Sequence, residues 1–217
     1  MDVKDMRAKL LLMFLCQVFL TIALIYVPDI SKASEYDDFD YVCASDAVKS
    51  GSVVDAIIKS NELAGYCKDG LVKRVRDVSL VKSTVIEVCQ GSTIPAGWVI
   101  VETVSGAPNC PGPTGYLAYR IERVQGLSQI NACSISQIPV NWVITRVNSG
   151  DAKCYDPGKS MYLSYTLADS VGQAAMQVCG VSPIPSGWVI TATTPGVAEC
   201  LDMPWGGYRA FSIINLN

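Results

Sequence analysis

The sequence predicts an all-β protein built from four tandem repeats of about 45 residues, each with three strands and each stapled by one disulfide. Three observations lead to this prediction. A twelve-residue pattern recurs, a second cysteine follows it at a constant interval, and runs of β-branched and aromatic residues surround both cysteines. The predicted repeats span residues 43–84, 85–128, 129–173 and 174–217, and the first is degenerate.

The first 33 residues indicate export. Lys4, Arg7 and Lys9 precede an apolar run over residues 10–27, and small residues close the segment. This pattern predicts a signal peptide over residues 1–33. A retained membrane-anchor helix is the alternative, because the run approaches the length that spans a bilayer. The protein is therefore expected to be secreted, periplasmic or at the cell surface, and to contact a membrane only through residues 10–27 if they remain uncleaved.

Charge and composition exclude several functional classes. Residues 34–42 are acidic and are predicted to form a solvated linker. The 217 residues include 17 Lys and Arg, 20 Asp and Glu, and no His. The resulting net charge of −3 argues against a nucleic-acid groove, which needs a basic stripe. The absence of His removes the commonest general base and all mixed Cys/His zinc sites.

The recurring pattern predicts a tight turn that leads directly into a strand. Its three clear copies begin at Cys89, Cys133 and Cys179, and all end in Trp-Val-Ile. Each contains a proline, predicted at the first corner of a type I turn with a G1 bulge, and two residues later Gly or Asn. A degenerate copy begins at Cys43, in which Lys49 replaces the proline and Ser52 replaces the tryptophan. There the spacing over residues 53–63 also fits a short helix.

A third strand is predicted after the second cysteine of each clear repeat. It begins at a tyrosine in all three: Tyr116, Tyr162 and Tyr208. In the first of these strands, alternation places Tyr119 and Ile121 on the core face. The same alternation places Tyr116, Ala118 and Arg120 on a partly solvated face.

The cysteines are predicted to pair within repeats. Eight of the nine lie after residue 33, an even number for an oxidising compartment. Units this small need a staple, because their cores alone barely offset chain entropy. Sequence leaves the connectivity open, but the repeat favours four pairs: Cys43–Cys67, Cys89–Cys110, Cys133–Cys154 and Cys179–Cys200. Without a Cys-x-x-Cys pair or His, no metal site and no other cofactor is predicted.

No acidic residue recurs at equivalent positions, so no acid/base constellation is found and the chain is not predicted to be an enzyme. The recurring aromatics are the candidate binding residues: Tyr116, Tyr162, Tyr208, Trp98, Trp142 and Trp188. Each series either fills the core or forms an exposed platform for sugar rings or a partner protein. The tyrosines suit the exposed platform better, because they stand opposite the predicted core face.

These observations favour an exported, non-catalytic repeat protein that acts as a structural or binding module for a glycan or a protein at the cell surface. The alternative is a secreted inhibitor or effector that binds one protein target through its loops, such as residues 105–115 and 147–159. The sequence leaves open whether the four repeats form a rod or close into a ring. Three strands per repeat and a disulfide within each repeat favour the rod.

Overall fold

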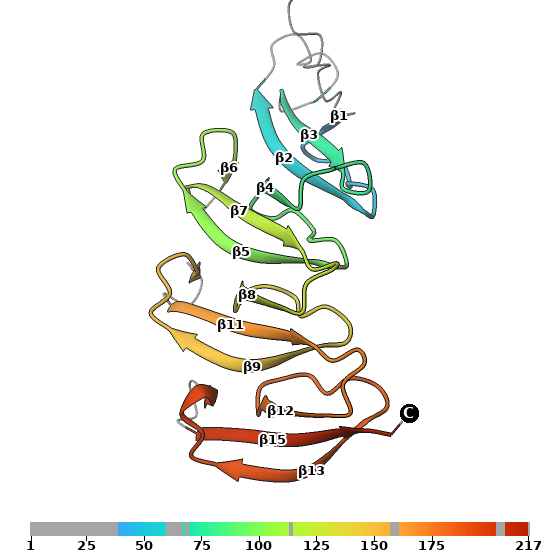
Figure 1. Cartoon of the computed structure of the whole chain (residues 1–217). Helices are drawn as coiled ribbons and strands as arrows, with labels where there is room; N and C mark the ends of the chain where they lie inside the picture. Colours follow the sequence, from blue (N-terminus) through green and yellow to red (C-terminus); the bar gives the residue numbers. More distant parts are fainter. Residues whose placement is uncertain are drawn as a thin grey trace, which may run out of the picture. The chain divides into compact units, whose positions relative to one another are not determined.

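The computed structural model describes residues 39–59, 67, 70–112, 115–156, 161–202 and 207–216 (Figure 1). The predicted signal peptide and residues 34–38 of the predicted linker lie outside this part of the chain. Within it, no helix is long and apolar enough to cross a membrane. The described residues are nearly all β, as the sequence predicts.

The strands that build the sheets are β1 (Phe39–Cys43), β2 (Ser52–Lys59), β3 (Leu71–Asp77), β4 (Val85–Cys89), β5 (Trp98–Ser105), β7 (Gly115–Arg123), β8 (Gln129–Cys133), β9 (Trp142–Ser149), β11 (Met161–Asp169), β12 (Ala175–Cys179), β13 (Trp188–Pro195) and β15 (Gly207–Asn215). Three strands have two residues each: β6 (Pro111–Gly112), β10 (Tyr155–Asp156) and β14 (Leu201–Asp202). One 3-10 helix, Ala198–Cys200, precedes β14.

Each repeat forms one antiparallel sheet whose last long strand lies in the centre. The strand orders are β1-β3-β2, β4-β7-β5, β8-β11-β9 and β12-β15-β13. In the second repeat, Ile121 of β7 pairs with Ile86 of β4 on one side and with Ile100 of β5 on the other. The two-residue strands pair with the start of the same central strand in the last three sheets. The four predicted three-stranded repeats are thus confirmed.

The recurring turn differs from the prediction in one respect. Its hydrogen bond runs from the N–H of Trp98 to the carbonyl of Pro95, at 3.2 Å, so the proline is the first residue of the turn and not its first corner. Gly97 follows at φ 78°, which matches the third position of a type II turn. Asn141, at φ 65°, takes this role in the third repeat. Because the proline position supplies only a carbonyl, Lys49 can replace it in the first repeat.

A β-bulge interrupts each second strand, and the sequence pattern did not reveal it. In β5 the register to β7 shifts between Ile100 and Glu102, and the other second strands shift at the equivalent place. A bulge redirects the backbone N–H groups beside it and increases the local twist. The N–H of Ile100, next to the bulge, therefore bonds to the following repeat instead of to β7.

All four sheets carry one disulfide within the repeat. The pairs are Cys43–Cys67, Cys89–Cys110, Cys133–Cys154 and Cys179–Cys200, the same four that the repeat pattern favours. A bond that closes a loop of about twenty residues restricts the unfolded chain and contributes roughly 3 kcal/mol to stability.

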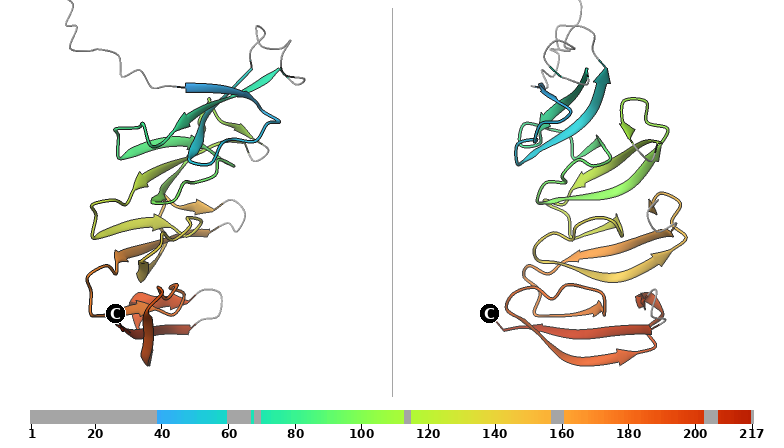
Figure 2. Two further views of the ribbon diagram at one scale, coloured as in Figure 1. Left: turned by 90° about the vertical axis from the view of Figure 1, so that its right-hand side faces the viewer. Right: turned by 180° about the vertical axis from the view of Figure 1, so that it is seen from behind.

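Neighbouring sheets contact each other through the second strand of one repeat and the first strand of the next. These contacts join β2 to β4, β5 to β8 and β9 to β12. Figures 1 and 2 show the described sheets following one another in an open stack. Of the rod and the closed ring, the described repeats adopt the open arrangement.

One serine in each interface bonds to the backbone of the preceding repeat. The three bonds run from the N–H of Val54 to Ser92 Oγ at 2.9 Å, from Ile100 to Ser136 at 2.9 Å and from Ile144 to Ser182 at 2.8 Å. Each serine stands three residues after the first cysteine of its repeat. The bulge and the serine therefore act together: the bulge turns one peptide N–H outward, and the next repeat supplies its acceptor.

The core lies between the sheets and not within single repeats. Val54 of the first repeat belongs to the same buried cluster as the Cys89–Cys110 disulfide and Ala118 of the second. Ala118, predicted on the partly solvated face, is fully buried, whereas Tyr116 on the same strand is 56% exposed. The prediction for Ala118 was wrong because alternation along one strand cannot show that a neighbouring repeat covers part of its outer face.

The first repeat departs from two expectations. Residues 52–59 form strand β2 and not a helix, because the bulge, not a helical turn, produces the irregular apolar spacing. Strand β1 begins at Phe39, within the range predicted as the acidic linker, and pairs with β3. The guanidinium groups of Arg74 and Arg76 lie over the Phe39 ring, 4.4 and 4.7 Å from its centre, and hold this strand in place.

Candidate binding surface

The three repeat tryptophans are buried. Trp98, Trp142 and Trp188 begin β5, β9 and β13, as predicted, and they are 4, 5 and 9% exposed. The guanidinium of Arg123 lies 4.9 Å from the centre of the Trp98 ring and also donates to the carbonyls of Val78 and Val81. These side chains fill the core and leave little surface for a ligand.

The repeat tyrosines lie on the surface. Tyr116, Tyr162 and Tyr208 are 56, 48 and 45% exposed, and each is the second residue of the central strand of its sheet. We call these three residues the tyrosine row. The first repeat carries Gly70 at the equivalent place, just before β3.

The backbone of each row tyrosine is held on two sides. Its cross-strand partners are Pro111, Tyr155 and Leu201 respectively. Each tyrosine carbonyl also accepts a bond from the loop before it, as from Ala107 N–H to Tyr116 at 3.1 Å and from Val197 N–H to Tyr208 at 3.2 Å. A side chain on a fixed backbone loses little entropy when it binds, because only its own rotamer must be ordered.

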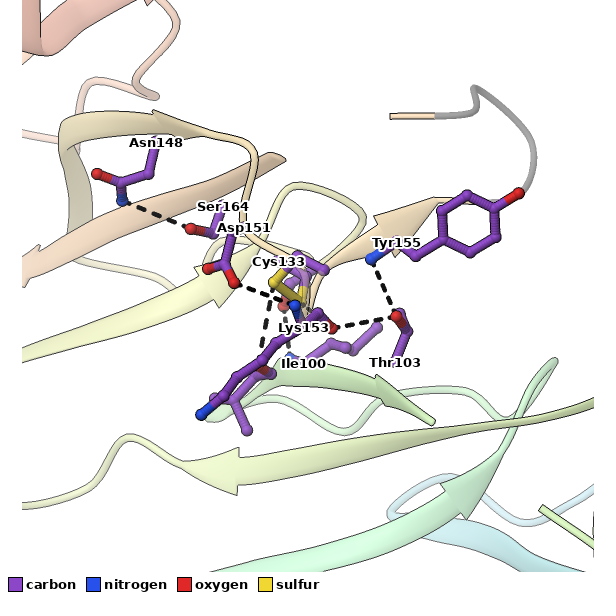
Figure 3. Close-up of a disulfide and its surroundings, with 11 residues drawn as sticks. Ile100, Thr103, Cys133, Asn148, Asp151, Lys153, Tyr155 and Ser164 are labelled. Carbon is purple, nitrogen blue, oxygen red and sulfur yellow. Dashed lines mark hydrogen bonds between the residues drawn. A yellow bond between two sulfur atoms is a disulfide. The ribbon is translucent and has the colours of Figure 1, made fainter. Parts of the chain in front are cut away.

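In the third repeat the row is widened by a second aromatic ring. The rings of Tyr155 and Tyr162 lie 5.1 Å apart at an angle of 37°. The N–H of Tyr155 donates to Thr103 Oγ1 of the preceding repeat at 3.0 Å, and Thr103 Oγ1 donates to the carbonyl of Lys153 at 3.1 Å (Figure 3). The N–H of Thr103 also donates to this carbonyl, at 2.7 Å. The aromatic pair is thus positioned by two repeats beside the Cys133–Cys154 disulfide.

A charged hollow between the second and third repeats was not expected from the sequence. Its charged and polar lining residues are Glu102, Arg120, Glu122, Asn131, Asp151 and Lys153. Arg120 and Glu102 form an ion pair across β5 and β7. These residues come from both repeats, so only the stacking of the sheets brings them together.

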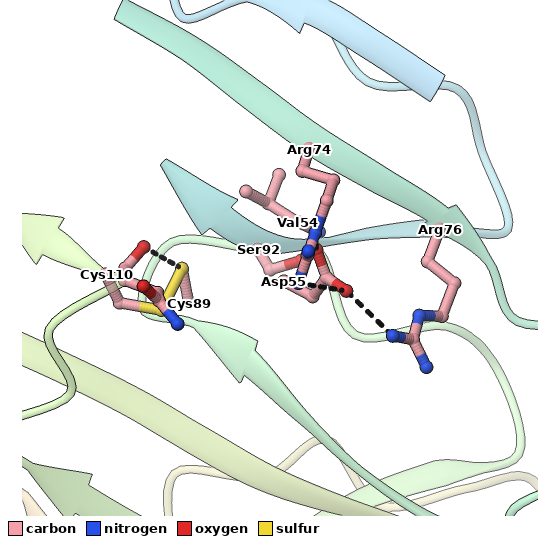
Figure 4. Close-up of polar contacts among 8 residues, drawn as sticks. Val54, Asp55, Arg74, Arg76, Cys89, Ser92 and Cys110 are labelled. Carbon is pink, nitrogen blue, oxygen red and sulfur yellow. Dashed lines mark hydrogen bonds and ion pairs between the residues drawn. A yellow bond between two sulfur atoms is a disulfide. The ribbon is translucent and has the colours of Figure 1, made fainter. Parts of the chain in front are cut away.

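The side chains at one position of the central strand change from charged to neutral along the stack. Arg74, Arg120, Thr166 and Ser212 occupy this position in the four sheets. In the first repeat, Arg74 and Arg76 both pair with Asp55, at 2.7 and 3.0 Å (Figure 4). In the third, Thr166 Oγ1 donates to Asn131 Oδ1 at 2.9 Å instead. At this position, the charged side chains therefore belong to the first two repeats.

Among the described residues, two titratable groups have clearly shifted pKa values. Hydrogen bonds from the Ser79 side chain and backbone lower the pKa of the Asp77 carboxyl. Burial raises the pKa of the Tyr119 hydroxyl, opposed by a hydrogen bond to Gln90 and reinforced by Asp156. Both shifts follow from local structure. Among the described residues, no three His, Cys, Asp or Glu side chains gather as metal ligands.

The observed geometry separates the candidate residues into a buried tryptophan series and an exposed tyrosine row. The four disulfides indicate an oxidising environment such as the periplasm or the cell exterior. Repeated, disulfide-stapled β sheets are consistent with a non-enzymatic domain in such a compartment. No protein-family model, curated protein or solved structure matches the chain.

Proposed function

We propose that this chain is an exported, non-catalytic repeat protein that binds a repeating polysaccharide through the tyrosine row. The observation that carries the proposal is the exposure of one tyrosine at the same place in three successive sheets. A tyrosine offers an apolar ring for the flat face of a sugar and a hydroxyl for its polar groups. Equivalent sites in a row suit a ligand whose own units repeat, since several weak contacts then add through avidity.

Binding to insoluble and soluble polysaccharides tests this proposal directly. The variants Y116A, Y162A and Y208A, singly and together, are compared with the unaltered exported chain by co-sedimentation and by glycan array. Each single substitution is expected to weaken binding about tenfold, and the triple variant to abolish it. Tyr41 supplies the matched control, because it is also 56% exposed but lies on β1, outside the row. Polysaccharide binding that survives in the triple variant would refute the proposal.

The charged hollow supports a second candidate, a secreted inhibitor or effector that binds one protein target. Residues of the second and third repeats line the hollow, and two of them, Asp151 and Lys153, belong to the loop over residues 147–159. Binding there is expected to weaken as salt is raised and to be lost in R120E, because opposite charges steer and fix such a partner. Stacking on the tyrosine row is expected to be nearly independent of salt. A salt titration of any captured ligand therefore distinguishes the two candidates.

A further inference from the structure

The three interfaces between repeats are built from the same two halves. The donor half belongs to the second strand of the earlier repeat: two apolar residues and one outward N–H beside the bulge. The acceptor half belongs to the later repeat: a side-chain oxygen three residues after its first cysteine, together with the disulfide. Within the buried clusters, Ile100 and Ile144 each lie with the disulfide of the following repeat.

The last repeat presents a donor half that no other described repeat covers. Val189 and Ile190 of β13 are 37 and 47% exposed. The equivalent residues of the other repeats are almost fully buried: Val53 at 0%, Val54 at 6%, Val99 at 0%, Ile100 at 3%, Val143 at 0% and Ile144 at 2%. The equivalent pairs in the other repeats face a following repeat, whereas no other described repeat covers Val189 and Ile190. The difference in exposure therefore follows from the absence of a following repeat among the described residues and not from the residues themselves.

The first repeat presents an acceptor half with no described repeat before it. Asp46 stands three residues after Cys43, where Ser92, Ser136 and Ser182 stand in the other repeats. It is exposed, and among the described residues its Oδ1 accepts one bond, of 3.3 Å, from the neighbouring Ser45 hydroxyl. Cys43 is half-buried, in contrast to Cys89 at 1% and Cys133 at 0% exposure.

We propose that copies of this chain associate head to tail, with the last repeat of one copy docked on the first repeat of the next. The geometry points to an interface that continues the internal ones, in which the N–H of Ile190 donates to the Asp46 carboxylate and Val189 and Ile190 cover the Cys43–Cys67 disulfide. A carboxylate accepts a peptide N–H more strongly than a hydroxyl does. The two surfaces differ, so the contact does not close on itself, and it generates an extended assembly.

The joint is expected to be weaker than the internal interfaces. Ser52 stands in the first repeat where Trp98 stands in the second, so the docked surface is smaller and more polar. Association is therefore reversible and concentration-dependent. Head-to-tail association also lengthens the tyrosine row and so extends the polysaccharide-binding proposal. The association itself does not depend on polysaccharide binding.

The mass of the exported chain, measured by sedimentation over a range of concentrations, tests the proposal. The mass is expected to rise with concentration without stopping at a dimer. V189D/I190D is expected to remain monomeric with an unchanged melting temperature, because both side chains are already exposed. D46A is expected to weaken association roughly tenfold or more. V140D is the matched control, since Val140 is 87% exposed in a turn away from both ends.

Mixing the variants separates a head-to-tail contact from other contacts. V189D/I190D retains the acceptor half of its first repeat, and D46A retains the donor half of its last repeat. A mixture of the two is therefore expected to form heterodimers at concentrations where neither variant associates alone. Closed dimers that D46A leaves unchanged would overturn the proposal in favour of a tail-to-tail contact. A wild-type chain that stays monomeric at millimolar concentration would overturn it altogether.

Discussion

The serine that joins the second and third repeats provides a quantitative test of the stacking. Ser136 is 7% exposed, and its Oγ accepts the N–H of Ile100, which is 3% exposed, at 2.9 Å. This N–H lies beside the bulge in β5 and donates across the interface between the repeats. The substitution S136A removes the acceptor and leaves a buried donor without a hydrogen bond.

The expected loss follows from the cost of such a donor. A buried peptide N–H without a partner costs about 1–3 kcal/mol. For a chain of this size, a loss in that range lowers the melting temperature by about 3–10 °C. Thermal unfolding of the oxidised protein, followed by circular dichroism, measures this shift.

A control variant lies in the same turn. Ser134 is two residues from Ser136, and its side chain forms no hydrogen bond with any other described residue, so S134A is expected to change the free energy of unfolding by less than about 0.5 kcal/mol. If S136A melts at the same temperature as S134A, the hydrogen bond between the N–H beside the bulge and the serine of the next repeat does not stabilise the stack, and the reasoning is wrong.

Three further predictions concern other parts of the structure, and each is tested by unfolding measurements. Asn141 lies at φ 65°, so N141V is expected to cost about 1–2 kcal/mol while N141G is nearly neutral. The raised pKa of Tyr119 means that the folded state holds this proton more tightly, so stability is expected to fall as pH rises above 10. Y119F should make that fall shallower and is sterically compatible, since Phe211 occupies the equivalent position. V143D is expected to prevent folding, because it buries an unpaired charge at a fully buried site, whereas V189D should melt like the wild type.

The sequence predicts the individual repeat well because its signals are local. Left-handed residues at Gly97 and Asn141, strand formers after each turn, and evenly spaced cysteines are all set within a few residues. The strand order within each sheet could not be predicted in the same way. The central place of β7 depends on pairing with both β4 and β5, and a linear pattern does not specify which strand lies between the others.

The side-chain contacts between stacked repeats were not predicted, for a related physical reason. Ala118 is buried by the preceding repeat, a contact that no alternation within its own strand encodes. One signal was nevertheless present. Ser92, Ser136 and Ser182 recur three residues after a cysteine, and a recurring polar residue beside a buried cysteine needs a hydrogen-bond partner.

The candidate surface was predicted in part. The alternation of side chains along the third strand correctly predicted that Tyr116 is exposed, and the turn pattern correctly predicted that Trp98 begins a strand, β5. The charged hollow could not be predicted from the sequence, because Glu102 and Asp151 come together only when the sheets of two repeats stack.

Disulfide mapping of the exported protein tests the central claim, a chain of separately stapled repeats, most directly. The protein is digested without reduction, and the linked peptides are identified by mass spectrometry. The structure predicts four linked pairs, Cys43–Cys67, Cys89–Cys110, Cys133–Cys154 and Cys179–Cys200, with no free thiol after residue 33. Linked peptides that join cysteines of different repeats, or free thiols among these eight, would contradict the account.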